Sequence, residues 1–208
     1  HAGNYGEPES RERVIFIGIR KDALKEEIAQ ILKNDLIPNH LNPYPQPTHN
    51  CTLNDETLAT PVVLCDVLKQ LKEPKESFDP SQRFYSKAKY MGAHCQGQKE
   101  ITMNSIGPTI RSEHHGNIEY RRLSLEHGGT NKNELEKGLA ERRLTPRECA
   151  LIQTFPPDFQ FVIPKDYDWK RFIVSASGAY KVIGNAVPPI LAYHIAMRIQ
   201  NLWSTYFK

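Results

Sequence analysis

The strongest hydrophobic run in the sequence occupies residues 14–19, which read Val-Ile-Phe-Ile-Gly-Ile. A short continuous apolar run of this kind is typical of a strand buried on both faces of a sheet. Such a strand needs neighbouring strands, and no other segment of the chain has a comparable pattern. We therefore expect this chain to contribute one strand to a sheet whose other strands lie elsewhere.

Helical patterns occur near both ends of the chain. Asp22 is expected to cap a helix that starts at Ala23, and Pro61 to occupy the first position of a second helix after Thr60. Pro188 and Pro189 open a last helix. Each of the three predicted helices has apolar residues at the spacing of one helical face. They are Leu24, Ile28, Ile31 and Leu32 in the first helix, Leu64, Val67, Leu68 and Leu71 in the second, and Leu191, Ile195, Ile199 and Leu202 in the last.

A clear helix start is found at Thr145, where Pro146 follows and Glu148 lies at the third position. Thr and Glu at this spacing form a capping box, so a helix is predicted that ends before residues 155–157, Phe-Pro-Pro. Residues 177–185 predict one short helical turn ended by Gly.

Residues 73–142 have a different composition, polar and mixed in charge, with no long helical period. Residues 34–61 are rich in Pro and Asn and are expected to be loop. These contrasts predict a small, irregular, partly β domain between two segments of another domain. The expected fold class is therefore mixed, α/β in the outer segments and α+β in the middle.

Composition narrows the functional classes only modestly. The 208 residues carry a formal net charge of +3, which permits nucleic-acid binding without requiring it. No apolar run is long enough to span a bilayer, and no signal-peptide pattern is found. The four cysteines form no CxxC pair and lie at no usual zinc-ligand spacing, so we expect free thiols, a cytoplasmic location and no metal.

Three segments carry candidate chemistry. Residues 5–13 read YGEPESRER and place Glu9, Arg11 and Arg13 on one side of an extended chain, where the guanidinium groups suit a phosphate or a base edge. The same segment also fits a solvated strand end with an ion pair. Residues 143–150 read RLTPRECA and residues 153–156 read QTFP, with Cys149 expected as a buried, inert thiol. Residues 180–189 read YKVIGNAVPP, which fits a ligand contact or a joint between helices.

In this order, the three segments resemble motifs VIII, IX and X of the DNA (cytosine-5) methyltransferases, which read Gln-x-Arg-x-Arg, Arg-Glu-Cys-Ala and Gly-Asn-x-Val. The spacing also resembles the family, because a variable target-recognition region separates motifs VIII and IX. Residues 107–122, GPTIRSEHHGNIEYRR, look like recognition-region sequence of bacterial members. One departure is Glu9, which stands where the family has Gln and needs a partner such as Arg11.

The resemblance implies a division of the chain and a role for each part. Residues 1–72 would end the catalytic-domain sheet, 73–142 would form the target-recognition domain, and 143–208 would hold motifs IX and X. Arg11 and Arg13 would support catalysis on the side of the flipped target cytosine. Asn185, Ala186 and Val187 would lie beside S-adenosylmethionine. The candidate DNA-binding residues are Thr109, Arg111, His114, His115, Asn117, Arg121 and Arg122, although this charged cluster equally fits a solvated loop.

The segments that the family uses for the chemistry itself are not found in this sequence. None of the four cysteines follows a proline, and neither a Glu-Asn-Val segment nor a Gly-rich cofactor loop is present. The resemblance therefore implies the C-terminal, DNA-recognising portion of a methyltransferase, inactive alone. Its expected partners are double-stranded DNA and the portion or subunit with the catalytic Cys. The start at His1, inside motif VIII, favours a fragment or trimmed product over a natural second subunit.

Other interpretations stay open at this level. A non-catalytic DNA-binding module or relic would explain the basic residues, but such a binder has no need of Asn185 beside a cofactor. A restriction nuclease would need clustered carboxylates in a metal-binding pattern, and no convincing cluster is found. The apolar stripe of the last helix and the strand at 14–19 would be uncovered in the isolated chain, so self-association is expected.

Overall fold

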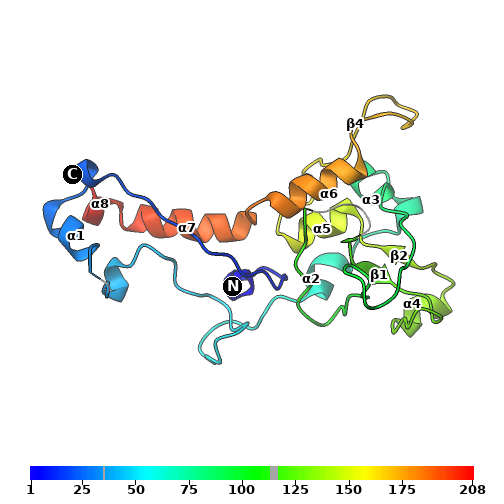
Figure 1. Cartoon of the computed structure of the whole chain (residues 1–208), viewed down its shortest axis with the longest axis horizontal. Helices are drawn as coiled ribbons and strands as arrows, with labels where there is room; N and C mark the ends of the chain where they lie inside the picture. Colours follow the sequence, from blue (N-terminus) through cyan, green and yellow to red (C-terminus); the bar gives the residue numbers. More distant parts are fainter. Residues whose placement is uncertain (35, 113–116) are drawn as a thin grey trace.

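The computed structural model describes residues 1–34, 36–112 and 117–208, which form a larger lobe and a smaller lobe joined by one long helix, α7 (Figure 1). The larger lobe holds the middle of the chain, and the smaller lobe holds α1 and α8. The helices are α1 (Glu26–Ile31), α2 (Leu64–Leu68), α3 (Pro80–Arg83), α4 (Lys132–Glu136), α5 (Pro146–Ile152), α6 (Ala176–Asn185), α7 (Pro189–Asn201) and α8 (Trp203–Tyr206). The strands are β1 (Tyr120–Arg122), β2 (Arg142–Arg143), β3 (Ile163–Pro164) and β4 (Phe172–Val174).

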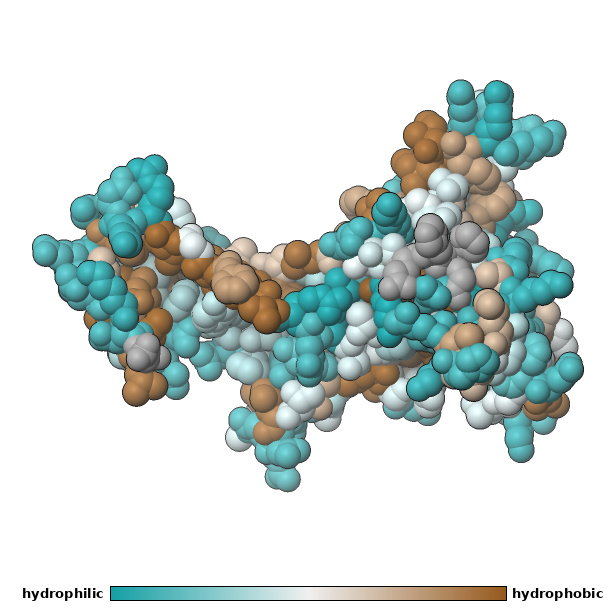
Figure 2. Space-filling model, viewed as in Figure 1, coloured by the Kyte–Doolittle hydropathy of each residue, from teal (hydrophilic) through white to brown (hydrophobic). Residues whose placement is uncertain are grey.

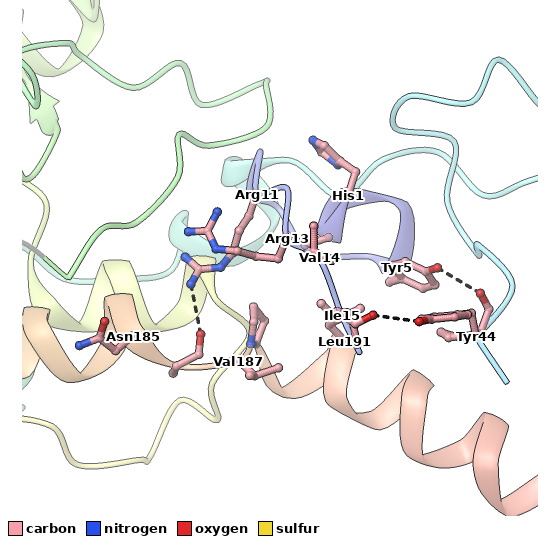
Figure 3. A pocket seen from close by; sticks show the side chains of 14 residues that line it. His1, Tyr5, Arg11, Arg13, Val14, Ile15, Tyr44, Asn185, Val187 and Leu191 are labelled. Atoms are coloured by element: carbon pink, nitrogen blue, oxygen red, sulfur yellow. Dashed lines mark hydrogen bonds between the residues drawn. The ribbon is translucent and has the colours of Figure 1, made fainter. Parts of the chain in front are cut away.

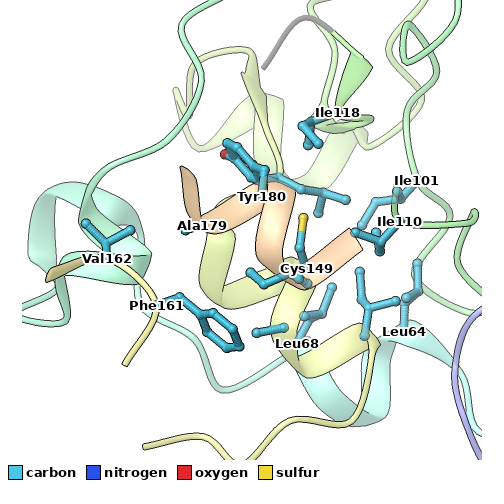
Figure 4. Close-up of a cluster of buried hydrophobic side chains, with 14 residues drawn as sticks. Leu64, Leu68, Ile101, Ile110, Ile118, Cys149, Phe161, Val162, Ala179 and Tyr180 are labelled. Atoms are coloured by element: carbon cyan, nitrogen blue, oxygen red, sulfur yellow. The ribbon is translucent and has the colours of Figure 1, made fainter. Parts of the chain in front are cut away.

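The larger lobe is built around α5 and α6, whose buried faces meet in its centre (Figure 4). Leu144, Cys149 and Ile152 are fully buried there together with Tyr180 and Ile183. The Tyr180 hydroxyl donates to the Leu144 carbonyl (2.6 Å), so the polar end of this side chain is satisfied inside an apolar core. Because α6 ends at Asn185, this packing fixes the position of that residue.

The helix start predicted at Thr145 is confirmed. The Thr145 hydroxyl accepts a hydrogen bond from the Glu148 amide, and the Glu148 carboxylate accepts one from the Thr145 amide. This reciprocal pair satisfies two amide groups that a helix start leaves without partners. The pair is buried, which makes α5 a rigid support for the segments around it.

Two short antiparallel pairs, β1 with β2 and β3 with β4, are the sheets of the described residues. They give the mixed helix and strand content that the sequence predicts. The larger lobe takes most of its other residues from loops between short elements.

The strand predicted at residues 14–19 is not formed in this structure. The segment is extended but unpaired within the described parts of the chain, and Val14 and Phe16 are 80% and 90% exposed. Ile19 packs against the small core of the other lobe instead. A buried strand needs neighbouring strands for its backbone groups, and no strand of the described residues pairs with this segment.

Three helix boundaries also differ from the sequence prediction. A 3₁₀ turn at Lys21–Ala23 precedes α1, which starts at Glu26 rather than Ala23. Helix α2 starts after Val63 rather than at Pro61, because Asp66 accepts a bond from the Val63 amide. Helix α6 has ten residues instead of one turn, and Ser175 caps its start.

The last helix begins at Pro189, as predicted, and connects the lobes (Figure 1). Leu202 and Tyr206 after it pack with Leu24, Ile28 and Leu41 in the core of the smaller lobe. Apolar side chains also lie on the outer surface, and Figure 2 shows hydrophobic residues along the bridge between the lobes. Val187, Tyr193 and Trp203 are 58–61% exposed. Within the described residues, no helix has the length and apolarity required for a membrane span.

Candidate functional site

Backbone hydrogen bonds pair the segment that leads into Arg11 and Arg13 with residues 107–110. The Ser10 amide donates to the Gly107 carbonyl and the Gly107 amide to the Pro8 carbonyl, both at 2.8 Å. The Thr109 hydroxyl donates to the Ser10 carbonyl. We call this pairing of residues 8–11 with residues 107–110 the clasp. Because residues 8–11 and residues 107–110 are far apart in sequence, only the tertiary fold brings them together.

Arg11 joins the clasp to the end of α6. Its guanidinium group donates to the carbonyl of Ile110 (2.9 Å), to that of Gly184 (3.0 Å) and to that of Ala186 (3.3 Å). The side chain is 6% exposed, so these bonds compensate for the removal of a charge from water. Arg11 therefore holds three segments together, and Figure 3 shows it beside the end of α6, where Asn185 and Val187 are labelled.

Arg13 has a different environment. It is exposed and donates to the carbonyl of Glu12, which leaves most of its guanidinium group facing solvent. The sequence prediction placed Glu9, Arg11 and Arg13 on one side of the chain, but Glu9 and Arg11 are buried and Arg13 is not. Of the two arginines expected to contact the target cytosine, Arg13 is the accessible one.

A polar hollow of about 340 Å³ lies where the clasp meets the end of α6. Three arginines line it together with a glycine, a serine and an amide side chain: Arg11, Arg13, Arg111, Ser112, Gly184 and Asn185. Three cations beside an amide favour a phosphate or the polar edge of a base. The fold thus brings together residues that the sequence assigned to catalysis, recognition and cofactor binding.

Arg111 is held in this hollow by two neighbours. With its side-chain amide oriented so that the oxygen faces the guanidinium group, Gln96 accepts from Arg111 Nε (3.0 Å) and Nη1 (3.3 Å). Glu119 lies 3.8 Å from Arg111 Nη1, and the Arg111 side chain is 33% exposed. The backbone of Arg111 lies against Gly184, where a Cβ atom would be 2.2 Å from the Arg111 carbonyl carbon. Only glycine permits this approach of α6 to the recognition segment.

Other candidate DNA-binding residues lie elsewhere. Thr109 belongs to the clasp, Asn117 is half-buried, and His114 and His115 lie outside the described residues. Arg121 and Arg122 are buried in ion pairs with Glu134, and Arg122 also pairs with Glu73 at 3.1 Å. A DNA contact would have to break these buried ion pairs, so neither Arg121 nor Arg122 is available to bind DNA in this structure.

The end of α6 also borders a second cavity, of about 410 Å³. Asn185 and Val187 are exposed beside it, and Ala186 is half-buried. Tyr5 and Tyr44 lie at its far wall, where their hydroxyls donate to Pro45 and Ile15 (Figure 3). An exposed amide next to apolar side chains suits one wall of a site for a nucleoside-like ligand.

Cys149 is unsuited to nucleophilic chemistry. It is 0% exposed, and burial raises the pKa of its thiol well above the usual range. A thiolate is the reactive form of cysteine, so this side chain is inert. Among the described residues, no group of three or more His, Cys, Asp or Glu side chains is arranged to hold a metal ion.

The sequence matches the model of a known protein family. The C-5 cytosine-specific DNA methylase family matches this sequence over residues 1–201. The chain belongs to this family. The expected order of motifs around a recognition region agrees with that membership.

Curated proteins that are similar to this chain point to the same family. The Type II methyltransferase M.BspRI of Lysinibacillus sphaericus is 31% identical over 214 residues, which cover 100% of this chain and 43% of the relative. M.BsuRI of Bacillus subtilis is 29% identical, and the match covers 100% of this chain and 42% of the relative. M.FnuDI of Fusobacterium nucleatum is 27% identical, and the match covers 97% of this chain and 53% of the relative. The chain thus spans about half the length of these relatives. All three relatives are named as Type II methyltransferases, and the matching family is described as C-5 cytosine-specific DNA methylases.

Sequence reasoning missed two features of the methylase site. It gave Arg11 a supporting role on the side of the target cytosine and did not anticipate the bonds to Ile110, Gly184 and Ala186 that make it a structural junction. It also passed over Glu7, which is 1% exposed beside Glu9. The signal for Glu7 was its place two residues before Glu9 in an extended segment, where alternate side chains share a side.

Proposed function

We propose that this chain is the target-recognition and C-terminal portion of a DNA cytosine-5 methyltransferase. The complete enzyme would methylate C5 of cytosine in a specific duplex site. The observation that carries the proposal is the meeting of Arg13, Arg111 and Asn185 around one hollow in a member of this family. Arg13 comes from the segment that resembles motif VIII, Arg111 from the segment that looks like recognition region, and Asn185 from the segment that resembles motif X.

Each group in the hollow has a task in this proposal. Arg13, the exposed cation, contacts the flipped cytosine or its phosphate. Arg111, oriented by Gln96 and Glu119, contacts a base edge or phosphate from the recognition side. Arg11 touches neither and keeps the other two in place through its bonds to the backbone.

The residues at the end of α6 fit one wall of a cofactor site. Asn185 would offer its amide to polar groups of S-adenosylmethionine, and Val187 its apolar surface. The cofactor supplies the methyl group when bound. The division of the chain at residues 72 and 142 into catalytic, recognition and closing segments remains part of the proposal.

Catalysis in this proposal requires a nucleophile from outside the present sequence. None of the four cysteines follows a proline, and the most buried, Cys149, is held as a neutral thiol. The exposed Val14, Phe16 and Trp203 support the same view, because they offer apolar surface to a cofactor-binding domain. We therefore propose that the chain alone is inactive and binds the portion that carries the catalytic cysteine.

The decisive experiment measures transfer of a labelled methyl group from S-adenosylmethionine to DNA. The chain is assayed alone and then mixed with the preceding portion encoded by the same gene or operon. Activity only in the mixture supports the proposal, whereas activity of the chain alone contradicts the need for an external nucleophile. DNA binding without methyl transfer in either assay would favour a non-catalytic DNA-binding module.

Matched variants test the hollow in the active mixture. Arg13→Ala should lower kcat/KM by about 10–100-fold, because a charge-assisted hydrogen bond contributes about 1.5–3 kcal/mol. Arg20→Ala is the control, since Arg20 is also exposed but pairs with Asp22 near the smaller lobe. Equal effects of the two substitutions would contradict a specific role for Arg13.

A further inference from the structure

Two acidic side chains are buried together directly before the site arginines. Glu7 is 1% exposed and Glu9 0% exposed. Glu9 Oε1 accepts from the Ile110 amide (2.5 Å) and from Arg11 Nη1 (3.4 Å). The other Glu9 oxygen and both Glu7 oxygens are buried and accept no hydrogen bond from the described residues.

The charge balance of this cluster requires a proton. Arg11 is the buried cation beside the pair, whereas Arg13 is exposed to water and Cys149, which also lies near Glu9, is neutral. Two ionised carboxylates would therefore leave one buried negative charge without compensation, which is strongly unfavourable. A single proton between the carboxyl groups removes this charge and supplies a hydrogen bond to an oxygen that otherwise has none.

We propose that Glu7 and Glu9 act as positioning residues that share one proton, so that the charged Glu9 fixes both Arg11 and the Ile110 end of the clasp. Glu7 is the protonated member and donates to Glu9. Through Glu9, the pair connects the arginine segment to the segment that carries Arg111. It therefore sets the shape of the hollow without touching DNA or substrate. The part of this proposal that concerns activity depends on the function proposed above.

The electrostatic environment assigns the proton to Glu7. Burial, and then hydrogen bonding and repulsion from Glu9, raise the pKa of Glu7 to about 10, although Arg11 and Arg13 oppose the shift. Burial raises the pKa of Glu9 as well, but the bonds from Glu7, Ile110 and Arg11 favour its charged form. Ile110 and Arg11 donate to Glu9, whereas no backbone amide or cation of the described residues donates to Glu7, which agrees with an ionised Glu9 and a protonated Glu7.

The pH dependence follows from the direction of the Glu7 shift. Because its pKa is raised on folding, the protonated Glu7 stabilises the fold fully below the ordinary value of 4.5. That contribution is lost progressively as pH rises toward about 10. Above this range a second buried charge would weaken the clasp. Glu7→Gln keeps a hydrogen-bond donor to Glu9 and cannot ionise, so it should equal the wild type at acid pH and exceed its stability at pH 8–9.

The first test is infrared spectroscopy of the chain with isotopically labelled glutamate at neutral pH. The proposal expects a carbonyl band of a protonated carboxyl group that persists at pH 7 and disappears in Glu7→Gln. The matched control is Glu12→Gln, which changes an exposed acid in the same segment and should leave the band unchanged. Absence of the band from the wild type would overturn the shared proton, whatever the enzyme activity.

The second test separates positioning from folding in the active mixture of chain and catalytic portion. Wild type and Glu12→Gln should lose kcat/KM as pH rises from 8 to 10, and Glu7→Gln should retain it over that range. Parallel pH profiles for the wild type and Glu7→Gln, with the band present, would overturn the positioning role. If the mixture transfers no methyl groups, the proposed function fails while the infrared band and the stability difference still decide the proton assignment.

Discussion

The contact between α6 and the recognition segment can be tested by two glycine-to-alanine substitutions in one helix. In Gly184→Ala, the new Cβ would lie 2.2 Å from the carbonyl carbon of Arg111. Ordinary contact begins near 3.4 Å, so the Arg111 backbone would have to move by more than 1 Å. In Gly178→Ala, the nearest atom is Val174 Cγ1 at 3.4 Å, which is ordinary contact.

The expected free energies of unfolding have opposite signs. Alanine is favoured over glycine within a helix by roughly 0.5–1 kcal/mol, so Gly178→Ala should stabilise the chain by about that amount. Gly184→Ala gains the same preference but overpacks a backbone contact, which costs about 1–3 kcal/mol. It also displaces Ile110, whose carbonyl accepts a charge-assisted bond from Arg11 that contributes about 1.5–3 kcal/mol. We expect a net destabilisation of about 2–4 kcal/mol.

The assay is denaturant unfolding of the isolated chain, followed by far-ultraviolet circular dichroism with fitted midpoints and slopes. The midpoint should rise for Gly178→Ala and fall for Gly184→Ala with the slope unchanged. If Gly184→Ala raised the midpoint as Gly178→Ala does, the close approach of α6 to Arg111 would be refuted. If Gly184→Ala is destabilised as expected, crystallography of that variant should show residues 110–112 displaced from α6.

Three further outcomes are expected. Tyr180→Phe should destabilise the chain by about 1–3 kcal/mol in the same unfolding assay, because the Leu144 carbonyl would lose its buried donor; a change below 0.5 kcal/mol would contradict that bond. Cys149 should resist a thiol reagent at pH 8 and react only in denaturant, since burial raises its thiol pKa, and rapid labelling in the native state, found by peptide mapping, would argue against this. Phe16→Asp should change the free energy of unfolding of the chain by less than about 0.5 kcal/mol, because Phe16 is 90% exposed. The same substitution should weaken binding to the catalytic portion by at least tenfold in calorimetry. Unchanged affinity would place the interface elsewhere.

Local signals in the sequence were sufficient for several elements. The capping box at Thr145 fixed the start of α5, because its hydrogen bonds involve residues three apart. Pro189 in the same way opened α7, and the buried Cys149 followed from its apolar neighbours. The order of the three motif-like segments indicated the family, which the match over residues 1–201 confirms.

The strand predicted at residues 14–19 shows where such signals fail. Its apolar pattern describes what the segment can bury, but a strand forms only with neighbours that satisfy its backbone groups. The described residues contain no such neighbour, so Val14 and Phe16 lie exposed. Helix α2 likewise begins at a cap provided by Asp66 rather than at the more obvious Pro61.

The sequence by itself determined the family, the local helix starts and the residue types of the candidate site. Only the tertiary structure decided which of those residues meet. It buried Arg11, Arg121 and Arg122 in bonds to carbonyl and carboxylate groups and left Arg13 exposed beside Arg111. The physical reason is that a buried charged side chain takes its hydrogen bonds from carbonyl and carboxylate groups of the chain and is then not available to a ligand. Those partner groups are distant in sequence, so the sequence pattern does not reveal them.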